Sequence, residues 1–365
     1  MNAVSSIRHV AGSLLVVGLS GTELTGLERA WLKLLRPSGI ILFRRNIAEA
    51  RQTRALLSEA TRYCNQYSLH CVDIEGGTVD RLRDAVAPMP SAQAVARAAQ
   101  KSGRAALMRK HGELVARETL AFGFNTTLAP VLDLGLPASA KVMGTRCAAP
   151  SPSGVIAYAR AFLAGLAAHG VVGCGKHFPG LGGGTLDSHL ETPAIERTWQ
   201  ELWNEDIPPY QELASELPMV MVNHANYPDT KGGDWPATAS AYWITTVLQK
   251  RLGYRGLIFS DDMEMGGILK FLPMEEAAIA AIRAGIHLLE ICHSPELILR
   301  CYESLIREAE RSASFRALLL DRANVSGKLR KVRFSRPFSR ALSEGQLASL
   351  REKILRFGEE IEAIG

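Results

Sequence analysis

The sequence lacks the patterns by which several classes of protein are recognised. Its six cysteines form no CxxC pair, so neither a zinc site nor a redox motif is indicated. No apolar run approaches the ~20 residues of a membrane-spanning helix. The net charge of +5 is mild for 365 residues and by itself favours neither nucleic acid nor a membrane surface. We therefore expect a cytoplasmic protein whose cysteines are reduced thiols of the core.

Two further absences narrow the choice of fold and location. No GxGxxG follows the first predicted strand, so a dinucleotide site is unsupported. Arg8 and His9 precede VAGSLLVVGLSG, which superficially resembles a signal peptide, but no A-x-A-like cleavage site follows it. The run LLVVG is also typical of a buried strand, which is the interpretation we favour.

The sequence does contain short apolar runs that alternate with amphipathic segments. Such runs suit parallel strands buried on both faces, and their alternation with helices indicates βαβ units. The predicted strands are residues 13–19, 39–45, 69–75, 126–134, 170–177, 219–225, 256–262 and 287–292. The clearest predicted helices are residues 49–64, 153–169 and 274–285. Eight such units predict an α/β fold of the (β/α)8 TIM-barrel type, with an open doubly wound sheet as the alternative.

Residues 1–300 are expected to form the barrel, and residues 301–365 a helical extension packed on it. Within the extension, residues 322–340 are basic and include KLRKVRFSR. This composition predicts a solvated surface whose arginine stems pack on the barrel, with a site for an anionic partner as the alternative.

Polar side chains gather where the predicted strands end. In a barrel of parallel strands the carboxyl ends meet at one face, and active sites lie there. The residues at these positions are Asp73, Glu75, Asp133, Lys176, His177, Asn223, His224, Ser260, Asp261 and Asp262. The sequence therefore predicts a functional site at this face.

The strand-end sequence FSDD places Asp261 and Asp262 next to each other. Adjacent residues of a strand point to opposite sides, so we expect one carboxylate in the barrel mouth and the other bonded to the scaffold. Helix capping by both aspartates fits the spacing equally well.

The stretch KHFPGLGGGTLDSHLETP, residues 176–193, combines glycines with titratable groups. Glycine suits a segment that must move or approach something closely. Asp187 and His189 are two residues apart, so their side chains can meet in an extended loop, and the carboxylate would raise the pKa of the imidazole. Such a histidine can serve as a general acid, which predicts a mobile catalytic loop. An aspartate and a histidine in a solvated loop are the alternative.

A third group surrounds VDIEGGTVDRL. Asp73 can accept hydrogen bonds from hydroxyl groups, and Arg81 can anchor an oxygen-rich ligand, as can Arg146 of VMGTRC. Taken singly, these residues also fit an ordinary strand–turn–helix junction. Together with a nucleophilic carboxylate and an acid/base histidine, they are the equipment of a retaining glycosidase.

These motifs resemble those of bacterial β-N-acetylglucosaminidases of glycoside hydrolase family 3. The family pattern KHFPGHG, four residues, DSH, three residues and P is matched in spacing from Lys176 to Pro193. The other similar segments, within roughly residues 12 to 300, are ILFRRN, VDIEGG, NTTLAPVLD, GTR, YRGLIFSDDMEM and AGIHLLEIC. Leu181, Thr78 and His287 depart from the residues that are common in the family.

The resemblance implies a role for each candidate residue. Asp261 matches the nucleophile, His189 the general acid/base and Asp187 its carboxylate partner. The positions that match sugar-binding residues are Asp73, Arg81, Arg146, Lys176 and His177. The resemblance further implies N-acetylglucosamine-containing glycans or muropeptides as substrates and no metal or organic cofactor. We expect a monomer without a nucleic-acid or membrane partner. The alternatives are a β-glucosidase, a phosphorylase or an inactive sugar-binding protein.

Overall fold

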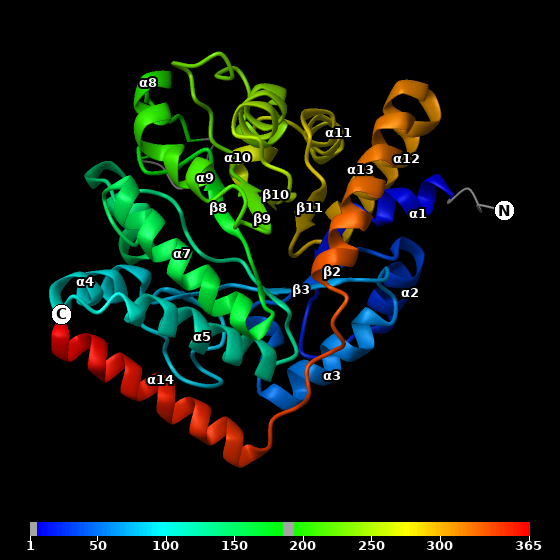
Figure 1. The fold of residues 1–365 in the computed structure, drawn as a ribbon. Coiled ribbons are helices and arrows are strands. Elements are labelled where there is room, and N and C mark those ends of the chain that lie inside the picture. The colour runs from blue at the N-terminus through cyan, green and yellow to red at the C-terminus, as the bar shows by residue number, and fades with distance from the viewer. Residues whose placement is uncertain (1–5, 185–192) are drawn as a thin grey trace.

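The predicted barrel is confirmed by the computed structural model, which describes residues 6–184 and 193–365 (Figure 1). Nine strands form one sheet, and all neighbours in it pair in parallel. In spatial order they are β7 (Val172–Gly173), β6 (Thr126–Thr127), β3 (Leu69–Val72), β2 (Gly39–Ile41), β1 (Leu15–Gly18), β11 (Leu288–Ile291), β10 (Leu257–Asp262), β9 (Met219–Val222) and β8 (Gly175–Phe178). β7 and β8 stand at the two ends of this order, yet only Cys174 separates them in the chain. The sheet therefore curls into a nearly closed barrel with eight strand positions.

The strands of the structure are shorter than the predicted runs, and in two of these runs the sequence shows the reason. The run 126–134 contains only β6 and, beyond it, an isolated bridge between Val131 and Lys176. Pro130 lies between them, and proline cannot donate to a sheet ladder. The run 69–75 leaves the barrel after β3 and continues as β4 (Ile74–Gly76), which pairs antiparallel with β5 (Val79–Asp80). Gly76 and Gly77 make this tight return with φ angles of 86° and 64°.

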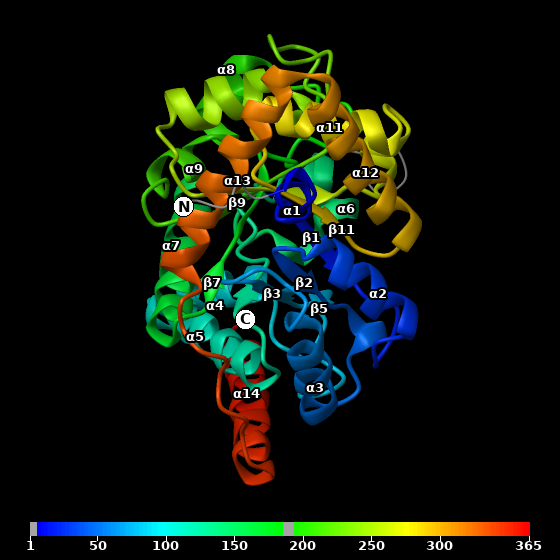
Figure 2. The same cartoon turned by 90° about the vertical axis from the view of Figure 1, so that its right-hand side faces the viewer.

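Helices surround the barrel, as Figures 1 and 2 show from two directions. The three predicted helices appear as α3 (Ala50–Thr61), α7 (Pro152–His169) and α11 (Met274–Ala284). In α7 the Ser151 hydroxyl accepts from the Gly154 N–H at the start, and Gly170 ends the helix at φ 77°. The other helices before residue 295 are α1 (Ile7–Gly12), α2 (Gly26–Leu35), α4 (Ala92–Ser102), α5 (Ala106–Ala121), α6 (Ala140–Met143), α8 (Trp199–Glu201), α9 (Pro208–Glu212) and α10 (Gly266–Leu269). Two π-helical segments, Leu202–Asp206 and Tyr242–Arg251, complete the ring.

Alternate residues of the strands fill the inside of the barrel. They form a buried cluster separate from the larger core between strands and helices. Its strand residues are Val16, Ile41, Leu69, Cys71, Val172, Met219, Met221, Leu257, Phe259 and Leu288. This filling leaves open space only beyond the strand ends, as expected for a barrel of this size.

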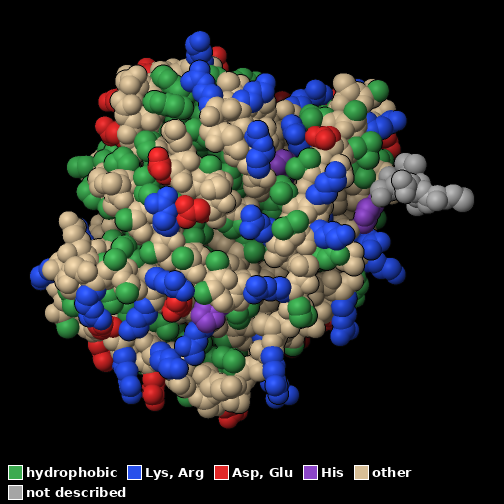
Figure 3. Space-filling view, viewed as in Figure 1, with side chains coloured by type: hydrophobic (Ala, Val, Ile, Leu, Met, Phe, Trp, Pro, Cys, Tyr) green, Lys and Arg blue, Asp and Glu red, His purple; other side chains and the backbone are tan. Residues whose placement is uncertain are grey.

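The chain ends in three helices, α12 (Pro295–Arg311), α13 (Ala313–Arg333) and α14 (Glu344–Ile364). α12 runs without a break through residue 300, and α14 lies along α4 and α5, where Glu360 pairs with Arg104 and Lys110. In the basic segment, the buried Arg330 donates to the carbonyls of Gln66 and Tyr67. The exposed cations of this segment are Lys328, Lys331, Arg333, Arg336 and Arg340. Figure 3 shows Lys and Arg side chains spread over one face of the molecule. Part of this segment is thus packed as predicted for arginine stems.

The six cysteines are free and buried, in line with the prediction of core thiols. Among residues 6–184 and 193–365, no helix is both long and apolar enough to cross a membrane.

Candidate active site

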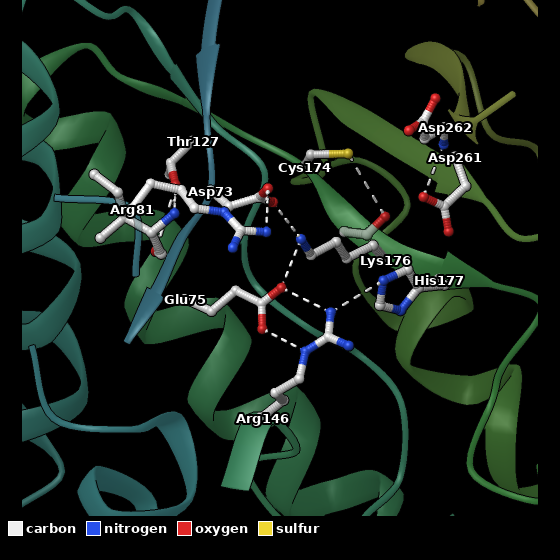
Figure 4. Close-up of polar contacts among 12 residues, drawn as sticks. Asp73, Glu75, Arg81, Thr127, Arg146, Cys174, Lys176, His177, Asp261 and Asp262 are labelled. Atoms are coloured by element: carbon white, nitrogen blue, oxygen red, sulfur yellow. Dashed lines mark hydrogen bonds and ion pairs between the residues drawn. The ribbon is translucent and has the colours of Figure 1, made fainter. Parts of the chain in front are cut away.

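A cavity of about 380 Å³ opens at the carboxyl ends of the strands. Six of the eight residues to which the resemblance assigns a role line it, namely Asp73, Arg81, Arg146, Lys176, His177 and Asp261. They come from segments up to 188 positions apart in the chain, and the barrel brings them to one face (Figure 4). The other two candidates, Asp187 and His189, lie outside the described residues.

Lys176 is the centre of a buried ionic cluster. It lies in β8, and its Nζ is 2.8 Å from Asp73 Oδ1 and 2.6 Å from Glu75 Oε1. Asp73 follows β3 and Glu75 lies in β4, so one ammonium group ties two consecutive segments to β8, two strand positions further round the barrel. Arg81 approaches Asp73 more loosely, at 3.5 Å.

Arg146 extends the cluster on its other side. Its Nε and Nη2 donate to the two oxygens of Glu75 at 2.8 and 2.9 Å, the bidentate geometry that suits a guanidinium group. Nη2 also lies 3.3 Å from His177 Nε2, while His177 Nδ1 lies 2.7 Å from Asp133 Oδ2. Because arginine can only donate, Nε2 accepts and Nδ1 carries the proton, which fixes the tautomer of His177.

These contacts determine the protonation states of Asp73, Glu75 and Lys176. Burial by itself would raise the pKa of Glu75 and of Asp73, but the neighbouring cations outweigh it and hold both pKa values below their usual range. Burial would likewise lower the pKa of Lys176, and the two carboxylates outweigh it, so that this pKa is raised. All three groups are therefore charged near neutral pH and present fixed hydrogen-bonding groups to the cavity.

β10 forms the opposite wall of the cavity. Both Asp261 and Asp262 line it, but Figure 4 shows their carboxyl groups pointing different ways, that of Asp261 towards the side of Lys176 and His177. Asp262 Oδ1 accepts from the Glu264 N–H at 3.0 Å, so this aspartate bonds to the scaffold as predicted for one of the pair. Neither caps a helix, because α10 starts after Met265 without a side-chain cap. Burial, followed by the charge of Glu264, raises the pKa of Asp262 to about 7.

In the described part of the chain, Asp262, Cys292 and His293 form the one group of at least three potential metal ligands that lie close together. Their ligand atoms lie within 4.8 Å of one another, and His293 Nε2 is 3.8 Å from Asp262 Oδ2. Burial and the surrounding carboxylates raise the pKa of the Cys292 thiol well above its usual value, so this thiol carries its proton when no metal is bound.

The glycines at the start of the predicted loop are needed for close packing. Gly180 has a φ of 145°, and a Cβ atom there would lie 2.7 Å from the Cβ of Asp206. At Gly183 a Cβ would meet the Arg197 side chain at 2.6 Å. Leu181, one of the departures from the family, donates its N–H to Asp133 Oδ1 at 2.7 Å and lines the cavity. Up to residue 184, the glycines of this segment are therefore explained by the close approach of its backbone to neighbouring side chains.

Three acidic residues of the site received no role from the sequence. Glu75 and Asp133 stand at predicted strand ends, and only the structure reveals that they orient Arg146 and His177. Glu290 also lines the cavity. A signal for it exists in LLEIC, because Glu290 alternates with Leu288 and Cys292 and so shares their side of the strand.

The chain is similar to several known proteins. The family model "Glycosyl hydrolase family 3 N terminal domain" matches residues 7–318. A β-hexosaminidase of Alkalilimnicola ehrlichii is 38% identical over 287 residues, which cover 78% of this chain and 82% of the relative. A solved glycoside hydrolase family 3 β-N-acetylglucosaminidase from Paenibacillus sp. str. FPU-7 has a TM-score of 0.85 and 28% identity, over 97% of this chain and 69% of that one. NagZ from Neisseria gonorrhoeae, solved in complex with N-trifluoroacetyl-D-glucosamine, has a TM-score of 0.72 and 28% identity, over 86% of this chain and 98% of that one.

Proposed function

The chain belongs to glycosyl hydrolase family 3, and we propose that this glycosidase is a retaining enzyme that releases terminal β-linked N-acetylglucosamine. The observation that carries the proposal is the cavity in which Asp261 faces a fixed set of charged, hydroxyl-binding groups. Relatives named β-hexosaminidase and a neighbour solved with an N-acylated glucosamine support the choice of sugar. The natural substrates we propose are muropeptides in the cytoplasm, handled by a monomer.

The side of the cavity that contains the ion pairs of Lys176 and Arg146 suits recognition of the sugar ring. Asp73 and Glu75 offer acceptors, while Lys176, Arg81 and Arg146 offer donors, so each ring hydroxyl can both donate and accept. Because Lys176 and Arg146 already pair with carboxylates, their positions are fixed before the substrate arrives. Such pre-organisation lowers the entropy that is lost on binding.

Asp261 is the proposed nucleophile. Its carboxylate attacks the anomeric carbon and forms a glycosyl ester, while His189 gives its proton to the glycosidic oxygen, which departs as an alcohol. His189 then takes a proton from water, the water attacks the anomeric carbon, and Asp261 leaves as a carboxylate. Asp187 holds the imidazole in the tautomer that this exchange needs. Two inversions at one carbon give net retention.

A chromogenic N-acetylglucosaminide tests the proposal. We expect turnover by the intact chain and a loss of about 10⁴-fold in kcat/KM for Asp261→Ala, on the scale of removing a catalytic nucleophile. The matched control is Asp321→Ala, since Asp321 is an exposed aspartate of α13. Faster turnover of a glucoside would indicate a β-glucosidase, and binding of the sugar without turnover would indicate a sugar-binding protein.

A fluorinated glycoside can locate the nucleophile directly, because the covalent glycosyl-enzyme that it forms is hydrolysed slowly. Mass spectrometry after incubation should find the sugar on the peptide that contains Asp261 and should find none in Asp261→Ala. An adduct on Asp262 would overturn the assignment. Repeating the turnover assay with phosphate separates hydrolysis from phosphorolysis, because only the latter yields a sugar 1-phosphate.

A further inference from the structure

Glu290 is a buried acid in the cavity to which the mechanism gives no task. It lies in β11, next to the strand that carries Asp261, and only 2% of its surface is exposed. Its neighbours two positions away, Leu288 and Cys292, belong to the cluster inside the barrel, so the Glu290 side chain points inward as well. It thus reaches the cavity from below rather than from the rim.

Part of the cavity that Glu290 enters is lined by apolar side chains. Ile41, Leu128 and Met221 line the same cavity and belong to the interior cluster. None of these three side chains offers a hydrogen bond to a bound molecule, apart from the weak acceptor of the methionine sulfur. A hydroxyl group that reached this depth would lose its water and would find in Glu290 a strong partner.

One carboxyl oxygen of Glu290 is without a hydrogen-bond partner among the described residues. Its Oε1 is buried and makes no hydrogen bond within the described part of the chain. Its backbone is fully bonded, since the N–H donates to Ser260 Oγ and the carbonyl accepts from the Met263 N–H, both at 2.9 Å. The backbone is therefore held in place while a buried polar atom remains unpaired, which is uncommon and often marks a functional group.

Burial and the nearby negative charges both oppose the ionisation of Glu290. Burial, followed by the charges of Asp262, Asp73 and Asp261, raises the pKa of Glu290 well above its usual value. Lys176 is the nearby cation, and it already binds two other carboxylates. The direction of this shift favours the protonated carboxyl group, which can donate a hydrogen bond as well as accept one.

We propose that Glu290 is a specificity-determining residue whose carboxyl group hydrogen-bonds a ring hydroxyl of the bound sugar at the floor of the cavity. The proposal rests on the glycosidase function given above. In an enzyme that removes a terminal sugar, the leaving group points to solvent, so the far side of the ring, with the hydroxyls at carbons 3, 4 and 6, enters first. The class of ligand is thus a pyranoside with a free hydroxyl on that side.

Two variants and four substrates test the contact. Glu290→Gln keeps a donor and an acceptor, whereas Glu290→Leu keeps only comparable bulk. The substrates are an aryl N-acetylglucosaminide and its 3-, 4- and 6-deoxy analogues. We expect the Gln variant to stay within about 3-fold of the intact enzyme in kcat/KM on the parent substrate. The Leu variant should lose about 10- to 100-fold, as for a buried neutral hydrogen bond.

The decisive readout is the pattern over the deoxy substrates. For one of them, the intact enzyme and the Leu variant should differ by less than about 3-fold, because the contacted hydroxyl is already missing. Equal losses on all four substrates, or no loss on the parent, would overturn the proposal. Melting temperatures control for folding, and Glu290→Met replaces the Leu variant if that variant does not fold.

Failure of the proposed function would look different. If the intact chain turned over none of the substrates, the same variants would be compared by calorimetric titration with N-acetylglucosamine and its three deoxy forms. Weaker binding by the Leu variant, confined to sugars that keep one particular hydroxyl, would still support the contact. Equal binding of the parent sugar by both proteins would refute it.

Discussion

On one wall of the cavity the carboxylates form ion pairs with lysine and arginine side chains. On the other wall, the carboxyl groups of Asp262 and Glu290 form no such pairs within the described residues. On the first wall, Asp73 and Glu75 contact Lys176, and Glu75 also forms the bidentate pair with Arg146. On the second wall, Asp262 and Glu290 make no such pair with a lysine or arginine in the described residues, and both have raised pKa values. We call these the paired wall and the acidic wall.

The difference separates two tasks within one small space. Ion pairs keep the groups of the paired wall charged and immobile, as recognition of hydroxyl groups requires. On the acidic wall, burial without a counter-charge favours the protonated form of two carboxyl groups beside the proposed nucleophile. Acidic side chains are thus charged acceptors on one side of the cavity, whereas on the other side burial and neighbouring charges favour their protonated form.

Replacing Lys176, the central cation of the paired wall, should have the largest effect on both stability and activity. In Lys176→Met, Asp73 and Glu75 lose a partner in a site where Lys176 is only 3% exposed. Breaking a buried pair from one side costs about 3–5 kcal/mol. We expect the free energy of unfolding at pH 7 to fall by about 3 kcal/mol and kcat/KM to fall by at least about 100-fold.

Urea denaturation and steady-state assays measure both effects. Lys33→Met, at an exposed lysine of α2, is the matched control and should change neither quantity appreciably. A loss of stability below about 1 kcal/mol in Lys176→Met would mean that the two carboxylates do not depend on this cation, and the distinction between the walls would fail.

The sequence predicts the barrel and most of the strand-end groups because both follow from local patterns. Apolar runs such as 256–262 mark strands, and the polar residues that follow them must meet at one face. Which groups pair is not a local property. Lys176 and Asp73 are 103 positions apart, and their contact depends on how the barrel closes.

The charge states escape prediction for the same reason. Asp73 and Asp262 both follow or end an apolar strand, yet the pKa of Asp73 is lowered while that of Asp262 is raised. Glu290 sits within the strand pattern LLEIC, where an acid gives no sign of whether a partner faces it. The places of Asp187 and His189 relative to Asp261 stay predictions.

The two walls should respond to pH with opposite signs. The pKa of Asp262 is about 7 in the folded state, above the usual carboxyl value, so the folded state binds more protons than the unfolded state from about pH 4 to pH 7. The free energy of unfolding therefore falls as pH rises through this range. Asp262→Asn removes the decline and should be more stable than the intact chain by about 1–3 kcal/mol at pH 8, with little difference at pH 4.

On the paired wall, Glu75→Gln tests the opposite pH dependence of stability. The folded-state pKa of Glu75 is lowered, so its stabilising contribution is present above the usual carboxyl pKa of about 4.3 and is lost as pH falls below it. This variant should be destabilised at pH 7 and less so at pH 3. Urea denaturation of both variants from pH 3 to pH 8 measures the two slopes, and slopes of the same sign would refute the electrostatic contrast.

Arg81→Gln should show the smallest effect, because this residue joins the paired wall only at its edge. Its Nη2 is 3.5 Å from Asp73 Oδ2 and its side chain is 30% exposed, while Asp73 keeps Lys176 at 2.8 Å. Partly exposed pairs contribute about 0–1 kcal/mol, so the free energy of unfolding should fall by less than about 1 kcal/mol. KM should rise about 3- to 10-fold, since one donor to the sugar is lost, while kcat stays nearly constant. A loss of stability as large as that of Lys176→Met would mean that exposure does not grade the contributions of the paired wall.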